Sequence, residues 1–219
     1  MMTGAGQVAV DKLDGQQPTW NEVWESSAGL NWFGRQLQRA QFKAIVWMLG
    51  ELPLSKDARL LDLGCGSGRS LADFRKMGYA NSIGIDIAPN SIKVCEGMGL
   101  KAGKDVFLMD GTSTSFQSGE FELVYSGGVI EHFPDFEPFV REMTRISNSY
   151  VLLMQPNHFS LFRKVVDLLR GVPVDEYFYR EEDYTVRFEQ YGFSLIGKRG
   201  CHFNEQFALL YRRKQLGET

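Results

Sequence analysis

The pattern of apolar and polar positions changes character near residue 58. Before that point, apolar residues recur at helical spacing from Arg35 to Leu52 and the run stops before Pro53, which predicts an amphipathic helix. After it, short apolar runs alternate with helix-sized intervals, which predicts parallel strands joined by helical crossovers. The predicted strands are 58–63, 81–87, 106–109, 121–126 and 150–154, and the predicted helices between them are 67–77, 89–97 and 136–147.

The last third of the chain follows a different pattern. Helices are predicted over 159–169 and 181–191, followed by two strand-like runs over 193–198 and 207–213. The link between these two runs is too short for a crossover, so they must be antiparallel. The sequence therefore predicts an α/β fold with one doubly wound, mostly parallel sheet that ends in an antiparallel strand.

Three glycines at alternate positions follow the first predicted strand of the sheet. Gly64, Gly66 and Gly68 come directly after Asp62-Leu63, at the strand-to-helix turn where open α/β sheets bind ligands. Glycine there allows positive φ and close approach of a ligand to the backbone. The spacing differs from the G-x-G-x-x-G pattern of dinucleotide sites, and the carboxylate of Asp62 would repel a pyrophosphate. A ligand with a cationic amino group suits this turn better.

Two further acidic residues follow the next predicted strands. Asp86 ends the second strand, where a carboxylate can accept both hydroxyls of a ribose, and Asp110-Gly111 follows the third, where a carboxylate can accept an adenine amino proton. Each residue also has a purely structural interpretation. Asp86 can simply be a polar residue at the end of a strand, and Asp-Gly is a common turn dipeptide. Both interpretations stay open from the sequence.

Composition narrows the classes of partner. The 219 residues carry a formal net charge of −3, so nucleic acid is not an expected partner, although Arg212-Arg213-Lys214 is either a local basic patch or a solvated end. No apolar run is long enough for a membrane span. The three cysteines have no metal-ligand spacing, so no metal site is expected, and their sparse, odd number suggests a reducing compartment such as the cytoplasm.

Four segments in order carry a family resemblance. LLDLGCGSGRS, GIDIAPNSI, MDG and YSGGVIEHF are similar to the ordered motifs of class I S-adenosylmethionine-dependent methyltransferases. The resemblance implies a Rossmann-like sheet with strand order 3-2-1-4-5-7-6 and S-adenosylmethionine as the cofactor. It also implies one methyltransferase domain over 1–219, with an aromatic helical cap 19–52, a cofactor-binding core 58–157 and a substrate side 158–219. The polar, Gly- and Gln-rich composition of 1–18 predicts a flexible stretch.

By this resemblance, the glycine turn lines the methionine part of the cofactor, Asp86 binds the ribose, Ile87 packs on the adenine and Asp110 reaches its amino group. Cys65 is expected to act as a small apolar residue of the turn rather than as a nucleophile. The cofactor-binding residues implied are Asp62, Gly64, Cys65, Gly66, Gly68, Asp86, Ile87, Asp110, Gly111, Ser126 and Gly127.

The resemblance implies an enzyme that transfers a methyl group by an SN2 step to a small-molecule acceptor, which the sequence does not identify. His132 is the candidate general base, with Glu131 beside it, because both follow the fourth strand and histidine titrates near neutrality. His132 can instead brace its loop against Pro134. Trp20 and the other aromatic residues of 19–34 either cover the ligand or anchor the first helix. The alternatives are a non-catalytic cofactor-binding or partner protein and an NAD-dependent oxidoreductase.

Overall fold

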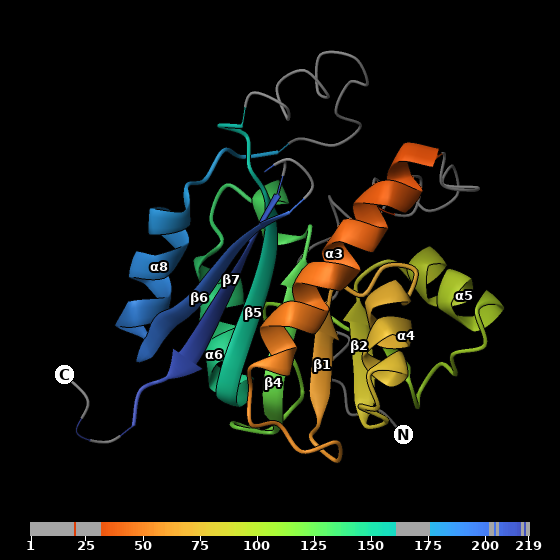
Figure 1. The fold of residues 1–219 in the computed structure, drawn as a ribbon. Helices are drawn as coiled ribbons and strands as arrows, with labels where there is room; N and C mark the ends of the chain where they lie inside the picture. Colours follow the sequence, from red (N-terminus) through yellow and green to blue (C-terminus); the bar gives the residue numbers. More distant parts are fainter. Residues whose placement is uncertain are drawn as a thin grey trace.

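One seven-stranded sheet forms the centre of the molecule, in the order β3-β2-β1-β4-β5-β7-β6 (Figure 1). β7 pairs antiparallel with β5 and β6, and the other neighbouring strands are parallel. The predicted fold class, strand order and antiparallel ending are confirmed. The strands are β1 (Leu60–Leu63), β2 (Ser82–Asp86), β3 (Val106–Leu108), β4 (Phe121–Gly127), β5 (Ser147–Pro156), β6 (Phe193–Cys201) and β7 (Gln206–Arg213).

The structure is a computed structural model that describes residues 20, 32–160, 176–201, 204, 206–215 and 217. The expected flexible stretch 1–18, most of the aromatic segment 19–34 and nearly all of the helix predicted over 159–169 lie outside these residues. The described helices are α3 (Trp32–Gly50), α4 (Arg69–Lys76), α5 (Pro89–Gly97), the 3-10 turn η2 (Ile130–His132), α6 (Glu137–Ile146) and α8 (Glu181–Gln190).

Helices cover both faces of the sheet, as Figure 1 shows. Buried side chains of α3, α4 and α5 pack in one core, and those of α6 and α8 pack in a second core on the opposite face. β1 contributes to both cores, because successive side chains of a strand point to opposite faces. Leu60 joins the first core, and Leu61 and Leu63 join the second. Asp62 therefore faces the side of α3 and α4, inside the apolar interior.

Two element boundaries differ from the prediction for physical reasons. α4 begins at Arg69 and not at residue 67, because Gly68 has a φ of 75°, which a right-handed helix does not allow. β5 begins at Ser147, directly after α6, and is longer than the predicted strand over 150–154. Its first residue pairs with Phe121 of β4, and a register shift follows this pair. Long-range pairing of this kind is not visible in local spacing.

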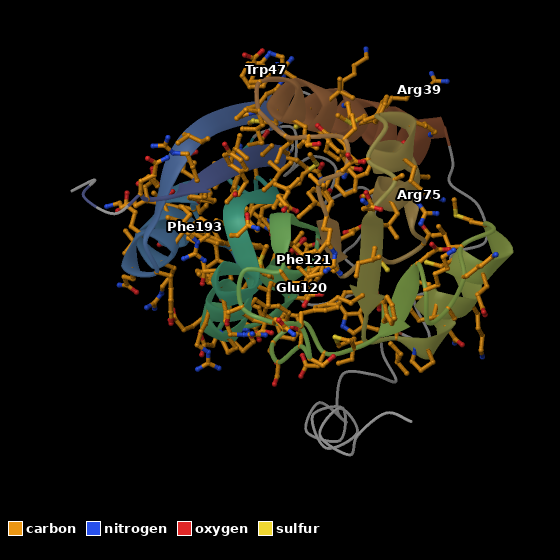
Figure 2. The ribbon with its side chains drawn as sticks, turned by 90° about the horizontal axis from the view of Figure 1, so that it is seen from below. Arg39, Trp47, Arg75, Glu120, Phe121 and Phe193 are labelled. Atoms are coloured by element: carbon orange, nitrogen blue, oxygen red, sulfur yellow. The ribbon has the colours of Figure 1, made fainter. Side chains whose placement is uncertain are left out.

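The amino ends of the parallel strands are closed by side-chain contacts. Figure 2 views the molecule from this end, with Glu120 and Phe121 near its middle and Trp47 at its rim on α3. Arg59 pairs with Glu120 at 2.9 Å and lies over the ring of Phe121. Such part-exposed pairs each contribute about 1 kcal/mol or less. The opposite, carboxyl ends of the strands are where a ligand has access.

Two observations concern partner classes. Within the ranges that the structure covers, no helix is long and apolar enough to cross a bilayer, and no three metal-ligating side chains gather. Arg213 donates hydrogen bonds to the carbonyl oxygens of Thr144 and Ser147 and stacks over Phe193. This arginine therefore has a structural role at the end of β7.

Candidate functional site

A cleft with about 600 Å³ of empty space, its open mouth included, lies at the carboxyl ends of β1, β2 and β4. This is the point where the strand order reverses between β1 and β4, the usual ligand position in open α/β sheets. The cleft brings together six of the residues implied as cofactor-binding: Gly64, Gly66, Asp86, Ile87, Asp110 and Gly111. Its other walls are Trp20, Leu63, Ile85, Met109, Gly128, Val129, Phe133 and Phe139.

The glycine turn has a backbone that only glycine adopts readily. Gly64, Gly66 and Gly68 have φ values of 77°, 51° and 75°. A Cβ at Gly64 would also lie 2.2 Å from Cγ2 of Val129. The N–H groups of Gly64 and Cys65 both donate to the carbonyl of Ile85 at 2.9 Å, which ties the turn to β2. The turn is thus rigid and presents bare backbone to the cleft.

Asp86 both holds the turn and faces the cleft. Its Oδ2 accepts the N–H of Gly66 and its Oδ1 accepts the N–H of Ala88, each at 2.9 Å. Burial raises the pKa of Asp86, and these backbone hydrogen bonds oppose the rise. The carboxylate is consequently fixed in direction, which suits a group that receives two ligand hydroxyls.

Asp62 lies beneath the turn and is only 1% exposed. Its Oδ2 has no hydrogen-bond partner among the residues that the structure describes. Burial, with a smaller contribution from the charge of Asp86, raises the pKa of Asp62 to about 8. A buried carboxyl without a partner is costly, and a cationic group brought close to it would offset that cost. This arrangement fits a ligand with an amino group.

Asp110 forms the turn that the Asp-Gly dipeptide suggested, and it also lines the cleft. Its Oδ1 accepts the N–H and the hydroxyl of Thr112, both at 2.8 Å. Gly111 leaves room for Leu63, because a Cβ there would lie 2.8 Å from Cδ2 of that leucine. The two interpretations of Asp110 are therefore compatible.

A part-buried ion pair anchors the loop that follows Asp110. Oε1 of Glu142 in α6 accepts the N–H of Thr114 at 2.8 Å, and its Oε2 accepts Nε of Arg145 at 2.8 Å. Arg145 also donates to the carbonyl of Phe116 at 2.9 Å. Burial raises the pKa of Glu142, but the hydrogen bonds from Arg145 and Thr114 outweigh it and lower the pKa, so the carboxyl stays ionised. These contacts hold the loop after β3, and with it Asp110, against α6.

Four of the implied residues lie behind the cleft wall. The hydroxyl of Ser126 donates to the carbonyl of Leu63 at 3.0 Å, and Gly127 leaves room for the hydroxyl of Tyr125. Cys65 is buried below the turn beside Cys95, where hydrogen bonding between the thiols and burial raise the pKa of Cys65. Gly68 packs against Leu100.

The loop after β4 faces the cleft through Gly128 and Val129, which the sequence analysis did not single out. Gly128 has a φ of 72°, and the doubled glycine was the one available signal for such a turn. Other omitted wall residues are Leu63, Ile85, Met109, Phe133 and Phe139. These are apolar residues near strand ends, after η2 or in α6, and apolar composition does not distinguish a cleft wall from core.

Glu131 and His132 lie together in η2, at the side of the cleft. Nε2 of His132 is 3.9 Å from Oε1 of Glu131, and its ring meets Trp20 edge-on at 4.8 Å between centroids. Trp20 itself lines the cleft. The backbone carbonyl of Glu131 accepts the N–H of Tyr177 at 2.6 Å. The pair is therefore next to the cleft and also holds a neighbouring segment.

Part of this chain matches a known protein family. Residues 61–152 match the family model described as "Methyltransferase domain". The chain is 32% identical over 110 residues to ajmaline N-methyltransferase of Rauvolfia serpentina, covering 48% of this chain and 38% of that protein. It is 28% identical over 151 residues to the chloroplastic tocopherol O-methyltransferase of Arabidopsis thaliana, covering 58% and 42%. The chain thus spans about two fifths of the length of these relatives.

Solved structures show the same fold. Magnesium protoporphyrin IX methyltransferase from Synechocystis PCC 6803, crystallised with bound SAH, superposes with a TM-score of 0.67 at 16% identity, over 95% of this chain and 99% of that one. The fold of this chain is therefore that of the solved methyltransferase structure. Residues 61–152 of this chain are thus similar to the methyltransferase domain family.

Proposed function

We propose that the protein transfers a methyl group from S-adenosylmethionine to a hydroxyl or amine of a small molecule. One observation carries the proposal: Asp62, a buried carboxyl whose Oδ2 has no hydrogen-bond partner within the described part of the chain, lies beneath a turn of positive-φ glycines that Asp86 holds from the cleft side. That combination suits a ligand with both an amino group and a ribose. The N- and O-methyltransferases among the relatives support the same acceptor chemistry.

The residues of the cleft would divide the cofactor among them. Asp62 would attract its amino group, Asp86 would receive its ribose hydroxyls and Ile87 would pack on its adenine. Asp110 would accept the adenine amino proton beside Gly111. Four residues behind the cleft wall would hold the glycine turn and the loop after β4 in place: Ser126, Gly127, Cys65 and Gly68.

When bound, the cofactor supplies an electrophilic methyl group, so the protein's main task is to position the acceptor in line with it. Trp20 and Phe133 would exclude water at the mouth of the cleft. His132 would take the acceptor's proton when the acceptor is a hydroxyl, and Glu131 would stabilise the imidazolium that forms.

The activity is tested by incubating the full chain with S-adenosylmethionine and a library of small hydroxyl and amine compounds. Release of the demethylated cofactor with a subset of these compounds is the expected result. Cofactor binding by calorimetry, combined with no release from any compound, would favour the non-catalytic alternative. Absence of cofactor binding would overturn the proposal itself.

We expect His132→Ala to lower the turnover number roughly 10²- to 10⁴-fold for a hydroxyl acceptor, because proton removal would lose its base. Cofactor affinity should stay at the wild-type value, since the imidazole is beside the cofactor residues and not among them. Steady-state kinetics measures the turnover number, and calorimetry measures the cofactor affinity. A drop in melting temperature with an unchanged turnover number would instead identify His132 as a brace of its loop.

The remaining expectations from the sequence are proposals of the same kind. We infer a single methyltransferase domain over 1–219, a cytoplasmic location and no nucleic-acid partner. The free thiols of Cys65, Cys95 and Cys201 support the reducing compartment, and the acidic net charge supports the absence of nucleic acid.

A further inference from the structure

The segment that leads into α8 is joined to the turn η2 by two hydrogen bonds. The N–H of Tyr177 donates to the carbonyl of Glu131 at 2.6 Å, and the hydroxyl of Tyr179 donates to the carbonyl of Phe133 at 2.8 Å. The two accepting carbonyls belong to the residues directly before and after His132. The backbone on both sides of the candidate base is therefore held by a segment more than forty residues further along the chain.

The same segment is anchored near the end of β5. Nε2 of His158 lies 3.2 Å from Oε2 of Glu176, and the ring of Phe178 stacks on the imidazole with centroids 4.2 Å apart. The side chains of His158 and Glu176 are only 3% and 13% exposed, so their contact is shielded from water. We call residues 176–179 the strap. It connects the chain after β5 with the turn after β4.

Ring contacts hold the hydroxyl of Tyr179 in place. Its ring meets the rings of Phe136 and Tyr184 edge-on, with centroids 4.6 Å and 5.8 Å apart. Tyr184 is buried in α8, and Phe136 is buried directly before α6. Because both supporting rings belong to packed elements, the hydroxyl gives the carbonyl of Phe133 a donor in a fixed position.

The turn that the strap holds is short. η2 is a 3-10 helix of three residues, Ile130–His132, and this type of helix has poorer hydrogen-bond geometry than an α-helix. Nε2 of His132 lies 3.9 Å from Oε1 of Glu131. A turn of this length does not by itself fix the distance between two neighbouring side chains, so contacts from outside the turn contribute to it.

We propose that the strap positions the Glu131–His132 pair and that Tyr179 is its main positioning residue. The inference rests on the proposed function, in which His132 takes a proton from the acceptor. By holding the carbonyls on both sides of His132, the strap keeps the imidazole beside the carboxylate of Glu131 and against the ring of Trp20. A general base has to lie within hydrogen-bond reach of the proton that it removes. Loosening the strap would therefore impair the base without removing it.

The test measures how strongly Glu131 acts on His132. The chain has three histidines, so NMR can follow each imidazole through a pH titration of the full chain, and His132→Gln identifies the signal of His132. Glu131→Gln should lower the titration midpoint of His132 by about half a pH unit or more, because a carboxylate this close favours the imidazolium. With Tyr179→Phe already present, the drop should be less than about half as large, since the pair is no longer held together.

Tyr211→Phe is the matched control, because the hydroxyl of Tyr211 is hydrogen-bonded to Thr185 of α8 and not to η2. The drop should stay complete in this background. Glu176→Gln is a second strap variant: it removes the carboxylate that contacts His158, and it should reduce the drop as Tyr179→Phe does. A complete drop with both strap variants, a drop equally reduced by Tyr211→Phe, or no drop in the wild type would overturn the role of the strap.

Calorimetry with S-adenosylhomocysteine separates the strap from the proposed function. Tyr179→Phe and Glu176→Gln should bind it as tightly as the wild type does, since neither residue is among those that line the cleft. Weaker binding by both variants would connect the segment to the cofactor and overturn its specific role at His132. Failure of the wild type to bind S-adenosylhomocysteine would overturn the proposed function, while the NMR result would still decide whether the strap holds the pair.

Discussion

Replacing Asp86 with alanine is expected to weaken binding of S-adenosylhomocysteine more than tenfold. The substitution removes the acceptor proposed for two ribose hydroxyls, and each unpaired buried polar group costs about 1–3 kcal/mol. It also removes the acceptors of the Gly66 and Ala88 N–H groups, so the glycine turn loses its attachment to the end of β2. Calorimetric titration of the full chain gives the affinity, and thermal unfolding gives the accompanying loss of stability.

Asp105→Ala is the matched control for this experiment. Asp105 pairs with Arg75 at 2.7 Å and caps the backbone of Lys101, away from the cleft walls. It should therefore lower stability while leaving the affinity unchanged. If Asp86→Ala binds S-adenosylhomocysteine as tightly as the wild type, the ribose assignment is wrong and Asp86 serves the turn alone.

Asp62→Asn is expected to change how stability depends on pH. The pKa of Asp62 is about 8 in the folded protein, above the value near 4 of an unfolded chain. Between these values the folded state keeps a proton that the unfolded state has lost, so this group makes stability fall as pH rises, by about 1.4 kcal/mol per pH unit. Above pH 8 its effect is constant. The stability of Asp62→Asn relative to the wild type should thus increase from pH 5 to pH 8.

Thermal or urea unfolding of both proteins at several pH values measures this difference. The same variant should bind S-adenosylhomocysteine more weakly, because the amide cannot attract an amino group by charge. Parallel stability curves for the two proteins would show that Asp62 is ionised in the free protein. Unchanged affinity would show that its carboxyl does not serve the cofactor.

The sequence alone was sufficient for the order of elements and for the motif residues along the cleft. Strand periodicity and the positions of the helices fix a parallel sheet, since crossovers of that length leave little freedom in topology. The glycines at 64, 66 and 68 also predict a turn with positive φ, because glycine adopts such φ values readily. Strand ends were less accurate, as at Ser147, because pairing with distant strands sets them.

Local patterns did not distinguish the residues that line the cleft from those that support it. Asp62 and Ser126 point to the interior, because successive side chains of a strand face opposite sides of the sheet. There Oδ2 of Asp62 has no partner in the described ranges, and the hydroxyl of Ser126 donates to the carbonyl of Leu63. Gly128 and Val129 reach the cleft instead. Which residues line the cleft is therefore decided by the packing of elements that are distant in the sequence.

The sequence by itself predicted the α/β fold class with its antiparallel ending, and the glycine turn, Asp86 and Asp110 at the strand ends, because these depend on spacing within a few consecutive elements. The tertiary structure alone decided that Asp62 is buried, with no partner for its Oδ2 among the residues described, and that the N–H of Tyr177 donates to the carbonyl of Glu131. It also decided that the rings of Phe159 and Phe178 are exposed. The physical reason is that contacts between residues far apart in the chain arise only when the sheet and its two helical layers assemble.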